Sequence, residues 1–297
     1  MTAVSSLSTS SLMRDALASA RKVSVATLPA LLLFCVAVAV QSYINTLASQ
    51  GGQLVFLWLV SGIVTIFIGC FWSADMYRKL LPEAGTRGVM ADAARLLIAN
   101  LAVYGLYFLL VFLLTLFFSI FAGVLIGSAG YDPSDAANST EAVWQSMRTL
   151  STSGGAVVLY LLLLLAAAAL VWLGLRLILF GAATVAERNL VIFRSWSWTS
   201  GHAARIALLW AFLQLIPWLL LTLAATGVMY AMGFETVFSP FTGAEQELSQ
   251  TQHAMRALAI GLGTLVTAPV YWLGHGLAVA IYQRLAPNRV DADTTFG

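Results

Sequence analysis

Residues 154–186 read GGAVVLYLLLLLAAAALVWLGLRLILFGAATVA and contain one charged residue, Arg176. A bilayer core about 30 Å thick needs roughly 20 apolar residues of helix to cross it. This run is long enough, and it lacks the alternation of polar and apolar residues that indicates a membrane strand. It predicts a transmembrane helix, and the rest of the chain repeats the pattern.

The composition of the whole chain indicates a lipid environment. Of its 297 residues, 60% are hydrophobic and 9% are charged, whereas a soluble domain carries about 25% charged residues. The net charge of +2 gives no sign of a nucleic-acid partner. Cys35 and Cys70 lie inside apolar runs, so we expect small buried thiols without a disulfide framework or a metal site.

Six stretches are long and apolar enough to span a membrane. The predicted fold class is therefore all-α, a polytopic integral membrane protein whose spans pair as three helical hairpins. Proline occurs inside spans at Pro29, Pro217 and Pro269, which membrane helices tolerate because neighbouring groups satisfy the freed carbonyls. The predicted spans cover residues 24–47, 54–77, 97–128, 154–186, 204–233 and 255–283.

The distribution of basic residues predicts the topology, because cytoplasmic loops are enriched in Lys and Arg. Of the 15 basic residues, only Arg148 and Arg256 fall on the predicted outer side. Both termini are therefore expected in the cytoplasm, with acidic outer loops at 129–153 and 234–254. The predicted inner residues are Arg14, Arg21, Lys22, Arg78, Lys79, Arg87, Arg95, Arg176, Arg188, Arg194, Arg205, Arg284 and Arg289.

Three parts are expected: an interfacial N-terminal segment at 1–22, a transmembrane domain at 23–286 and a short cytoplasmic tail at 287–297. The first span exceeds the apolar core of a signal peptide, so it is expected to remain as an uncleaved anchor. From about Ser10 to Lys22 the chain is expected to lie along the inner surface, with Leu12, Met13 and Leu17 toward lipid.

Small residues ending in arginine precede each odd-numbered span: ALASAR at Arg21, ADAAR at Arg95 and GHAAR at Arg205. The pattern indicates three units, each with a short amphipathic inner-surface helix that leads into a hairpin. The alternative is that cytoplasmic ends of spans recruit arginine and small residues without any repeat.

Arg176 lies inside a span, where a charge costs about 2.5–3.5 kcal/mol at the helix centre. Glu187 is eleven residues further on, so a continuous helix would place both on one face about 16 Å apart. Two interpretations stay open. The guanidinium reaches the inner headgroups, or it faces the helix bundle as a functional group.

The stretch RNLVIFRSWSWTSGH at 188–202 is too polar and too short to span. Trp196 and Trp198 are typical of the membrane interface, where an indole buries its rings and keeps its N–H in water. Thr199 or Ser200 is expected to cap the helix of the fifth span. This segment is predicted to form an elbow at the inner surface.

The motif Arg176-Leu177, Glu187, Ser195-Trp196, Thr199 and Gly201 resembles bacterial multi-span proteins related to the membrane domain of glycerophosphoryl diester phosphodiesterases. The resemblance implies a bacterial inner-membrane protein. In those enzymes a separate soluble barrel performs the hydrolysis, and no part of this sequence is expected to form one, so the activity is not carried over.

The sequence shows no pattern that predicts catalysis, a metal or a cofactor. His202, His253 and His275 are scattered, and no nucleotide-binding loop or nucleophile elbow occurs. His275, among glycines in WLGHGL, is interpreted as a packing residue, with proton relay as the alternative. Asp75 is expected to pair with Arg78.

The leading hypothesis is a non-enzymatic, lipid-associated or scaffolding membrane protein whose partners are membrane lipids, including anionic phospholipid. Its candidate headgroup or polar-site residues are Arg176, Glu187, Arg188, Arg194 and Arg205. The alternative is a small-solute transporter or channel that uses Arg176, Gln214 and His275, with Pro217 and Pro269 breaking helices near the midplane.

Overall fold

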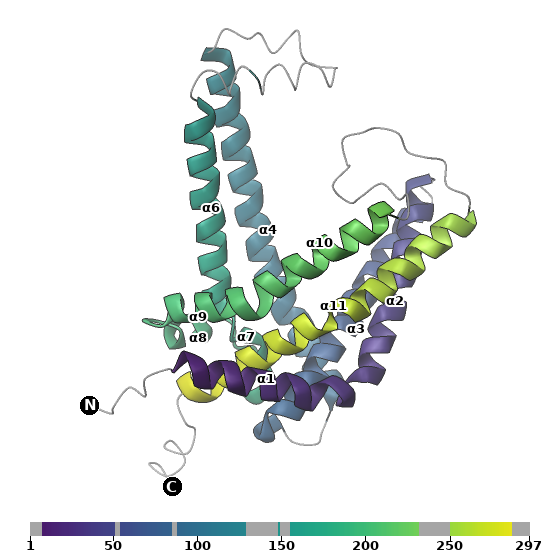
Figure 1. The fold of residues 1–297 in the computed structure, drawn as a ribbon, viewed down its shortest axis with the longest axis vertical. Helices are drawn as coiled ribbons and strands as arrows, with labels where there is room; N and C mark the ends of the chain where they lie inside the picture. Colours follow the sequence, from purple (N-terminus) through teal and green to yellow (C-terminus); the bar gives the residue numbers. More distant parts are fainter. Residues whose placement is uncertain are drawn as a thin grey trace. The chain divides into compact units, whose positions relative to one another are not determined.

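The structure is a computed structural model that describes residues 8–50, 54–84, 88–128, 148, 155–231 and 250–286. Every element within these ranges is helical, which confirms the predicted all-α class (Figure 1). Six helices are long and apolar enough to cross a membrane, so the predicted multi-pass character is supported. They are Leu28–Ala48, Val55–Leu80, Val89–Leu125, Val157–Ala186, Ala203–Gly227 and Gln250–Leu285.

The chain divides into two compact units, which are described separately. One comprises the described residues up to Ala99 and from Arg176 onward, and the other comprises Asn100–Leu175. The first contains α1 (Thr9–Ala26), α2 (Leu28–Gln50), α3 (Val55–Leu80), η2 (Pro82–Ala84), α7 (Phe180–Ala186), α8 (Arg194–Trp198), α9 (Ala203–Trp210), η4 (Ala211–Leu215), α10 (Ile216–Ala231) and α11 (Gln250–Leu285). Two helices pass from one unit into the other: α4 (Val89–Ser128) and α6 (Gly155–Leu177).

The N-terminal helix α1 packs along the C-terminal part of α11 (Figure 1). At Gly276 of α11 a Cβ atom would lie 2.6 Å from the carbonyl oxygen of Ala16, so glycine permits this close approach. Arg284 of α11 pairs with Asp15 and donates to the Ser11 hydroxyl at 2.8 Å.

The packing of α1 corrects the prediction that Leu12 faces lipid. Leu12 is fully buried, as are Ala16 and Val23, because this side of α1 contacts the protein. Met13 and Leu17 remain exposed as predicted, at 42% and 47%. The helix is therefore amphipathic with its most apolar stripe turned inward.

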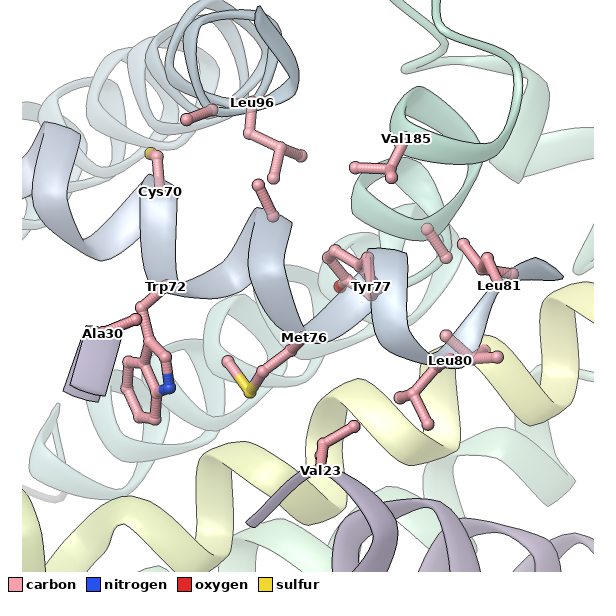
Figure 2. Packing of buried hydrophobic residues seen from close by; sticks show 14 of the residues in the cluster. Val23, Ala30, Cys70, Trp72, Met76, Tyr77, Leu80, Leu81, Leu96 and Val185 are labelled. Atoms are coloured by element: carbon pink, nitrogen blue, oxygen red, sulfur yellow. The ribbon is translucent and has the colours of Figure 1, made fainter. Parts of the chain in front are cut away.

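The core of the larger unit is built around the second half of α3. Figure 2 shows Trp72, Met76 and Tyr77 of this helix packed among Val23 of α1 and Val185 of α7. Small side chains on α7 allow the approach. A Cβ at Gly181 would lie 2.8 Å from the Tyr77 hydroxyl oxygen. This core fixes α7, the helix from which the elbow begins.

The threefold pattern does not build three equivalent surface helices. ALASAR lies inside α1, which Thr27 separates from the spanning helix α2. ADAAR belongs to the start of α4, which runs unbroken from Val89 to Ser128. GHAAR crosses the start of α9, because Gly201 and His202 precede the helix and Ala203 begins it. Only the first copy therefore forms a separate helix before its span within the described residues.

The smaller unit is a pair of helical segments from α4 and α6. The Tyr107 hydroxyl donates to the Leu170 carbonyl at 3.0 Å, and a Cβ at Gly174 would lie 2.7 Å from the same hydroxyl oxygen. Phe108 and Tyr160 are 74% and 70% exposed. Such extensive apolar exposure is unstable in water and is expected for a surface that contacts lipid.

The fifth span contains a π-helical turn, η4, which ends two residues before Pro217. Proline has no N–H, so it disrupts the regular hydrogen-bond ladder of the preceding turn. Gln214 lies in this turn, and its amide touches the position that a Cβ on Gly274 of α11 would occupy. Proline and glycine together let this polar side chain lie directly against α11.

Candidate functional site

The fourth span ends in a helix break. α6 stops at Leu177 and α7 begins at Phe180, although no proline lies between them. The span predicted at 154–186 is found as Val157–Ala186, but its helix is interrupted for two residues, which the sequence did not predict. The two side chains that were expected to share its face have separate partners: Arg176 contacts Trp196, and Glu187 pairs with Arg194.

Two hydroxyl groups from the elbow bind the carbonyl exposed at the break. Ser195 and Thr199 donate to the Arg176 carbonyl oxygen at 2.7 Å and 3.3 Å. The Leu179 N–H donates to the Ser195 hydroxyl at 3.2 Å. Ser195 and Thr199 are fully buried, so these bonds satisfy backbone groups that water does not reach.

The Arg176 side chain lies under the elbow. Its guanidinium carbon is 4.8 Å from the centroid of the Trp196 ring, within the range of a cation–π interaction. Arg176 is 7% exposed, whereas Trp196 is 36% exposed. The indole therefore covers one side of the buried guanidinium, a contact that neither of the two sequence-based interpretations named.

The next turn contains an unusual backbone conformation at Arg188. Its φ is 52°, and it is the only non-glycine residue with a positive φ among those described. Its guanidinium donates to the Ala84 carbonyl of η2 at 3.2 Å. The side chain thus joins the end of α7 to the segment that follows α3.

Local contacts hold the rest of the elbow. Arg194 and Glu187 form an ion pair at 2.9 Å. The Thr184 hydroxyl accepts from the Val191 N–H at 3.3 Å, a contact that connects buried α7 to the loop. These bonds define a short folded segment between the fourth and fifth spans.

The capping role predicted for Thr199 or Ser200 is not found. α9 is preceded by His202, which makes no side-chain cap. The Thr199 hydroxyl instead donates to the carbonyl oxygens of Arg176 and Ser195, and Gly201 takes a φ of 77°. Thr199 thus connects the elbow to the end of α6 and does not cap α9.

The outer surface of the elbow combines apolar and basic side chains. Leu190 and Phe193 are 46% and 69% exposed, and Trp196 lies beside them in the sequence. Arg188, Arg194 and, on α9, Arg205 are also exposed. Of the five candidate headgroup residues, the structure therefore exposes these three, whereas it buries Arg176 and pairs Glu187 with Arg194.

The residues of the alternative transport site have different neighbours. Arg176 contacts Trp196, and Gln214 contacts Gly274. The Nδ1 atom of His275 lies 2.7 Å from the Tyr271 carbonyl oxygen of its own helix, and its ring centroid is 4.7 Å from that of Tyr77. These contacts support the packing interpretation of His275.

A buried charge cluster connects α3 to α4. Asp92 binds Arg78 and Arg95, each at 2.6 Å, and the Asp92 side chain is 3% exposed. The pairing predicted between Asp75 and Arg78 is not observed, because Asp75 pairs with Lys79 one turn further on. Lys79 also donates to the Ala26 carbonyl at the end of α1, at 2.7 Å.

Comparisons with protein-family models, curated proteins and solved structures found no match to this chain. Function is therefore inferred from the site itself. In the described part of the chain, His, Cys, Asp and Glu do not gather in a group of three that would hold a metal ion.

Proposed function

We propose that the chain is a non-enzymatic multi-pass protein of a bacterial inner membrane that associates with anionic lipid at its cytoplasmic side. The observation that carries this proposal is the exposed elbow surface, where Phe193 and Leu190 lie between Arg188 and Arg194 in the sequence. Exposed apolar side chains and arginines together are typical of a surface that lies at the level of lipid headgroups.

The internal contacts of the elbow support this role. A segment that lies in the interface needs its backbone groups satisfied without water, because unsatisfied groups are costly near hydrocarbon. Ser195, Thr199 and Thr184 provide such bonds from the protein side. The apolar side chains Leu190 and Phe193 are then available to lipid.

The topology belongs to the same proposal. We place both termini in the cytoplasm, with three hairpins whose inner ends carry the basic residues. The exposed side of α1 adds Arg14, Arg21 and Lys22 to the cytoplasmic surface. Each basic residue near an anionic leaflet contributes about 1 kcal/mol to binding.

The resemblance to the membrane domain of glycerophosphoryl diester phosphodiesterases enters as part of this proposal. Its support is that Ser195, Trp196 and Thr199 of the motif all contact Arg176. Because the motif residues make structural contacts with one another, the resemblance gives no reason to assign hydrolysis to this chain.

Native mass spectrometry of the protein released from nanodiscs tests the proposal. In nanodiscs with equal phosphatidylglycerol and phosphatidylcholine, we expect retained lipid to be enriched in phosphatidylglycerol. A variant with Arg188→Gln, Arg194→Gln and Arg205→Gln should lose most of that enrichment. Equal retention of both lipids by the unsubstituted protein would overturn the proposed function.

A further inference from the structure

The conformation of Arg188 is the starting point. Helices commonly end with a residue in the left-handed region, and glycine is usual there because it has no Cβ to clash with the backbone. α7 ends in this way, with Glu187 as its cap and Arg188 next at a φ of 52°. An arginine is strained in this backbone conformation. Unlike glycine, however, it carries a guanidinium that can make contacts of its own.

The side chain of Arg188 has a structural contact, but this contact uses only a small share of its N–H donors. A guanidinium has five N–H donors in a fixed plane. One contact, to the Ala84 carbonyl oxygen at 3.2 Å, holds the group against η2. The residue remains exposed, so the arginine is anchored at one point with donors available to a ligand.

The charge of Arg188 is paired differently from the charges of Arg176 and Arg194, the arginines that precede and follow it in the sequence. Glu187 neutralises Arg194, and Arg176 is buried beneath Trp196. Among the ion pairs of the described residues, Arg188 takes part in none. Its charge is therefore available to an anion, and a planar guanidinium matches the oxygens of a phosphate.

We propose that Arg188 binds the phosphate of one anionic phospholipid of the inner leaflet. This inference rests on the proposed function and adds a single defined site to it. The exposed side chains of Leu190 and Phe193 follow within five residues, so a ligand with acyl chains fits this surface better than a soluble phosphate does.

Phosphatidylglycerol titrated into phosphatidylcholine nanodiscs is the probe, with native mass spectrometry as the readout. We expect Arg188→Gly to weaken retention of the tightest-bound phosphatidylglycerol about fivefold, the factor that corresponds to about 1 kcal/mol per near-surface charge. Arg188→Lys keeps the charge but not the planar donors, so retention should be intermediate.

The matched control is Arg256→Gln, which removes one charge from an exposed arginine at the opposite end of α11 from Arg284. It should retain phosphatidylglycerol as the unsubstituted protein does. Arg188→Gly relieves the backbone strain, so its thermal midpoint should not fall below that of Arg188→Ala. This comparison separates loss of a ligand from loss of the fold.

The outcomes are distinguishable. If the unsubstituted protein shows no preference for phosphatidylglycerol, the proposed function fails and the site fails with it. If it shows the preference and Arg188→Gly retains it unchanged, only the Arg188 site is overturned. Glycerol 3-phosphate is the soluble arm, and displacement of the lipid by it at millimolar concentration would overturn the assignment to a membrane lipid.

Discussion

The hydroxyl of Ser195 on α8 donates a hydrogen bond of 2.7 Å to the carbonyl of Arg176 in the last turn of α6. The two residues are nineteen positions apart, and the bond closes the elbow against the helix from which it departs. The same hydroxyl accepts from the Leu179 N–H. The buried Ser195 hydroxyl therefore forms hydrogen bonds with backbone groups on both sides of the helix break.

Ser195→Ala should destabilise the protein by about 1–3 kcal/mol, because it leaves the Leu179 N–H buried without this acceptor and removes one donor from the Arg176 carbonyl. Thermal unfolding in detergent micelles measures the effect. Ser197→Ala is the control, because Ser197 is exposed and its hydroxyl bonds only to the nearby Arg194 carbonyl in the same helix. Equal shifts in the two variants would contradict the role given to Ser195.

Asp92→Asn should cost about 3 kcal/mol, because removing one partner of a buried ion pair leaves an uncompensated charge. Arg78 and Arg95 both lose their carboxylate in this variant. Asp75→Asn is the matched control. Its pair with Lys79 is more exposed, with side-chain exposures of 22% and 35%, and should contribute about 0.5 kcal/mol. Unfolding followed by tryptophan fluorescence compares the two, and an equal loss would be evidence against a structural role of the Asp92 cluster.

Gly276→Ala should loosen α1 from α11, because the added methyl group would meet the Ala16 backbone carbonyl at 2.6 Å. We expect a loss of about 1–3 kcal/mol together with faster tryptic cleavage at Arg14 and Arg21. Gly263→Ala on the same helix meets nothing within 4 Å, so it should leave the cleavage rate unchanged. If cleavage accelerates in neither variant, Gly276 does not govern the docking of α1.

Arg188→Gly should be more stable than Arg188→Ala by about 1 kcal/mol, because only glycine occupies the left-handed region without strain. Both variants lose the contact with Ala84, so their difference isolates the backbone effect. The free energies of unfolding are measured side by side under the same detergent conditions. A more stable alanine variant would show that the φ of 52° is not maintained in the protein.

The proposed topology predicts a labelling pattern. Ala18→Cys, at an exposed position of α1, and Ser197→Cys, at an exposed position of the elbow, should react with a membrane-impermeant maleimide only from the cytoplasmic side. Asp135→Cys should react only from the opposite side. Cys35 and Cys70 are buried and should give little background. Labelling of Ala18→Cys and Asp135→Cys from the same side would overturn the arrangement.

The class of fold could be predicted because apolar length is a property of consecutive residues. The six spans found in the structure overlap all six predicted from sequence. A separate N-terminal element before the first span was also anticipated, and it is the helix α1. The direction of its buried stripe was not, because α1 packs against α11, which is far away in the sequence.

The elbow shows where reasoning from sequence stops. Its place between two spans followed from its polarity and length, and the resemblance had singled out Arg176, Ser195, Trp196 and Thr199, which the structure brings into contact. The break after Leu177 did not, because no proline marks it and the groups that satisfy the freed carbonyl arrive from nineteen and twenty-three residues further on. The αL conformation of Arg188 was equally unpredictable, since that position favours glycine.

The contact between α1 and α11 also sets an order of events during biosynthesis. α1 is the first described helix to leave the ribosome, whereas Gly276 and Arg284, which receive it, are among the last described residues to be made. Until then α1 has no docking site, and Leu12 and Val23 lack the cover they have in the finished protein. Docking of α1 therefore waits until α11 has been made, and the membrane surface or a chaperone is needed to cover Leu12 and Val23 while the intervening spans are inserted.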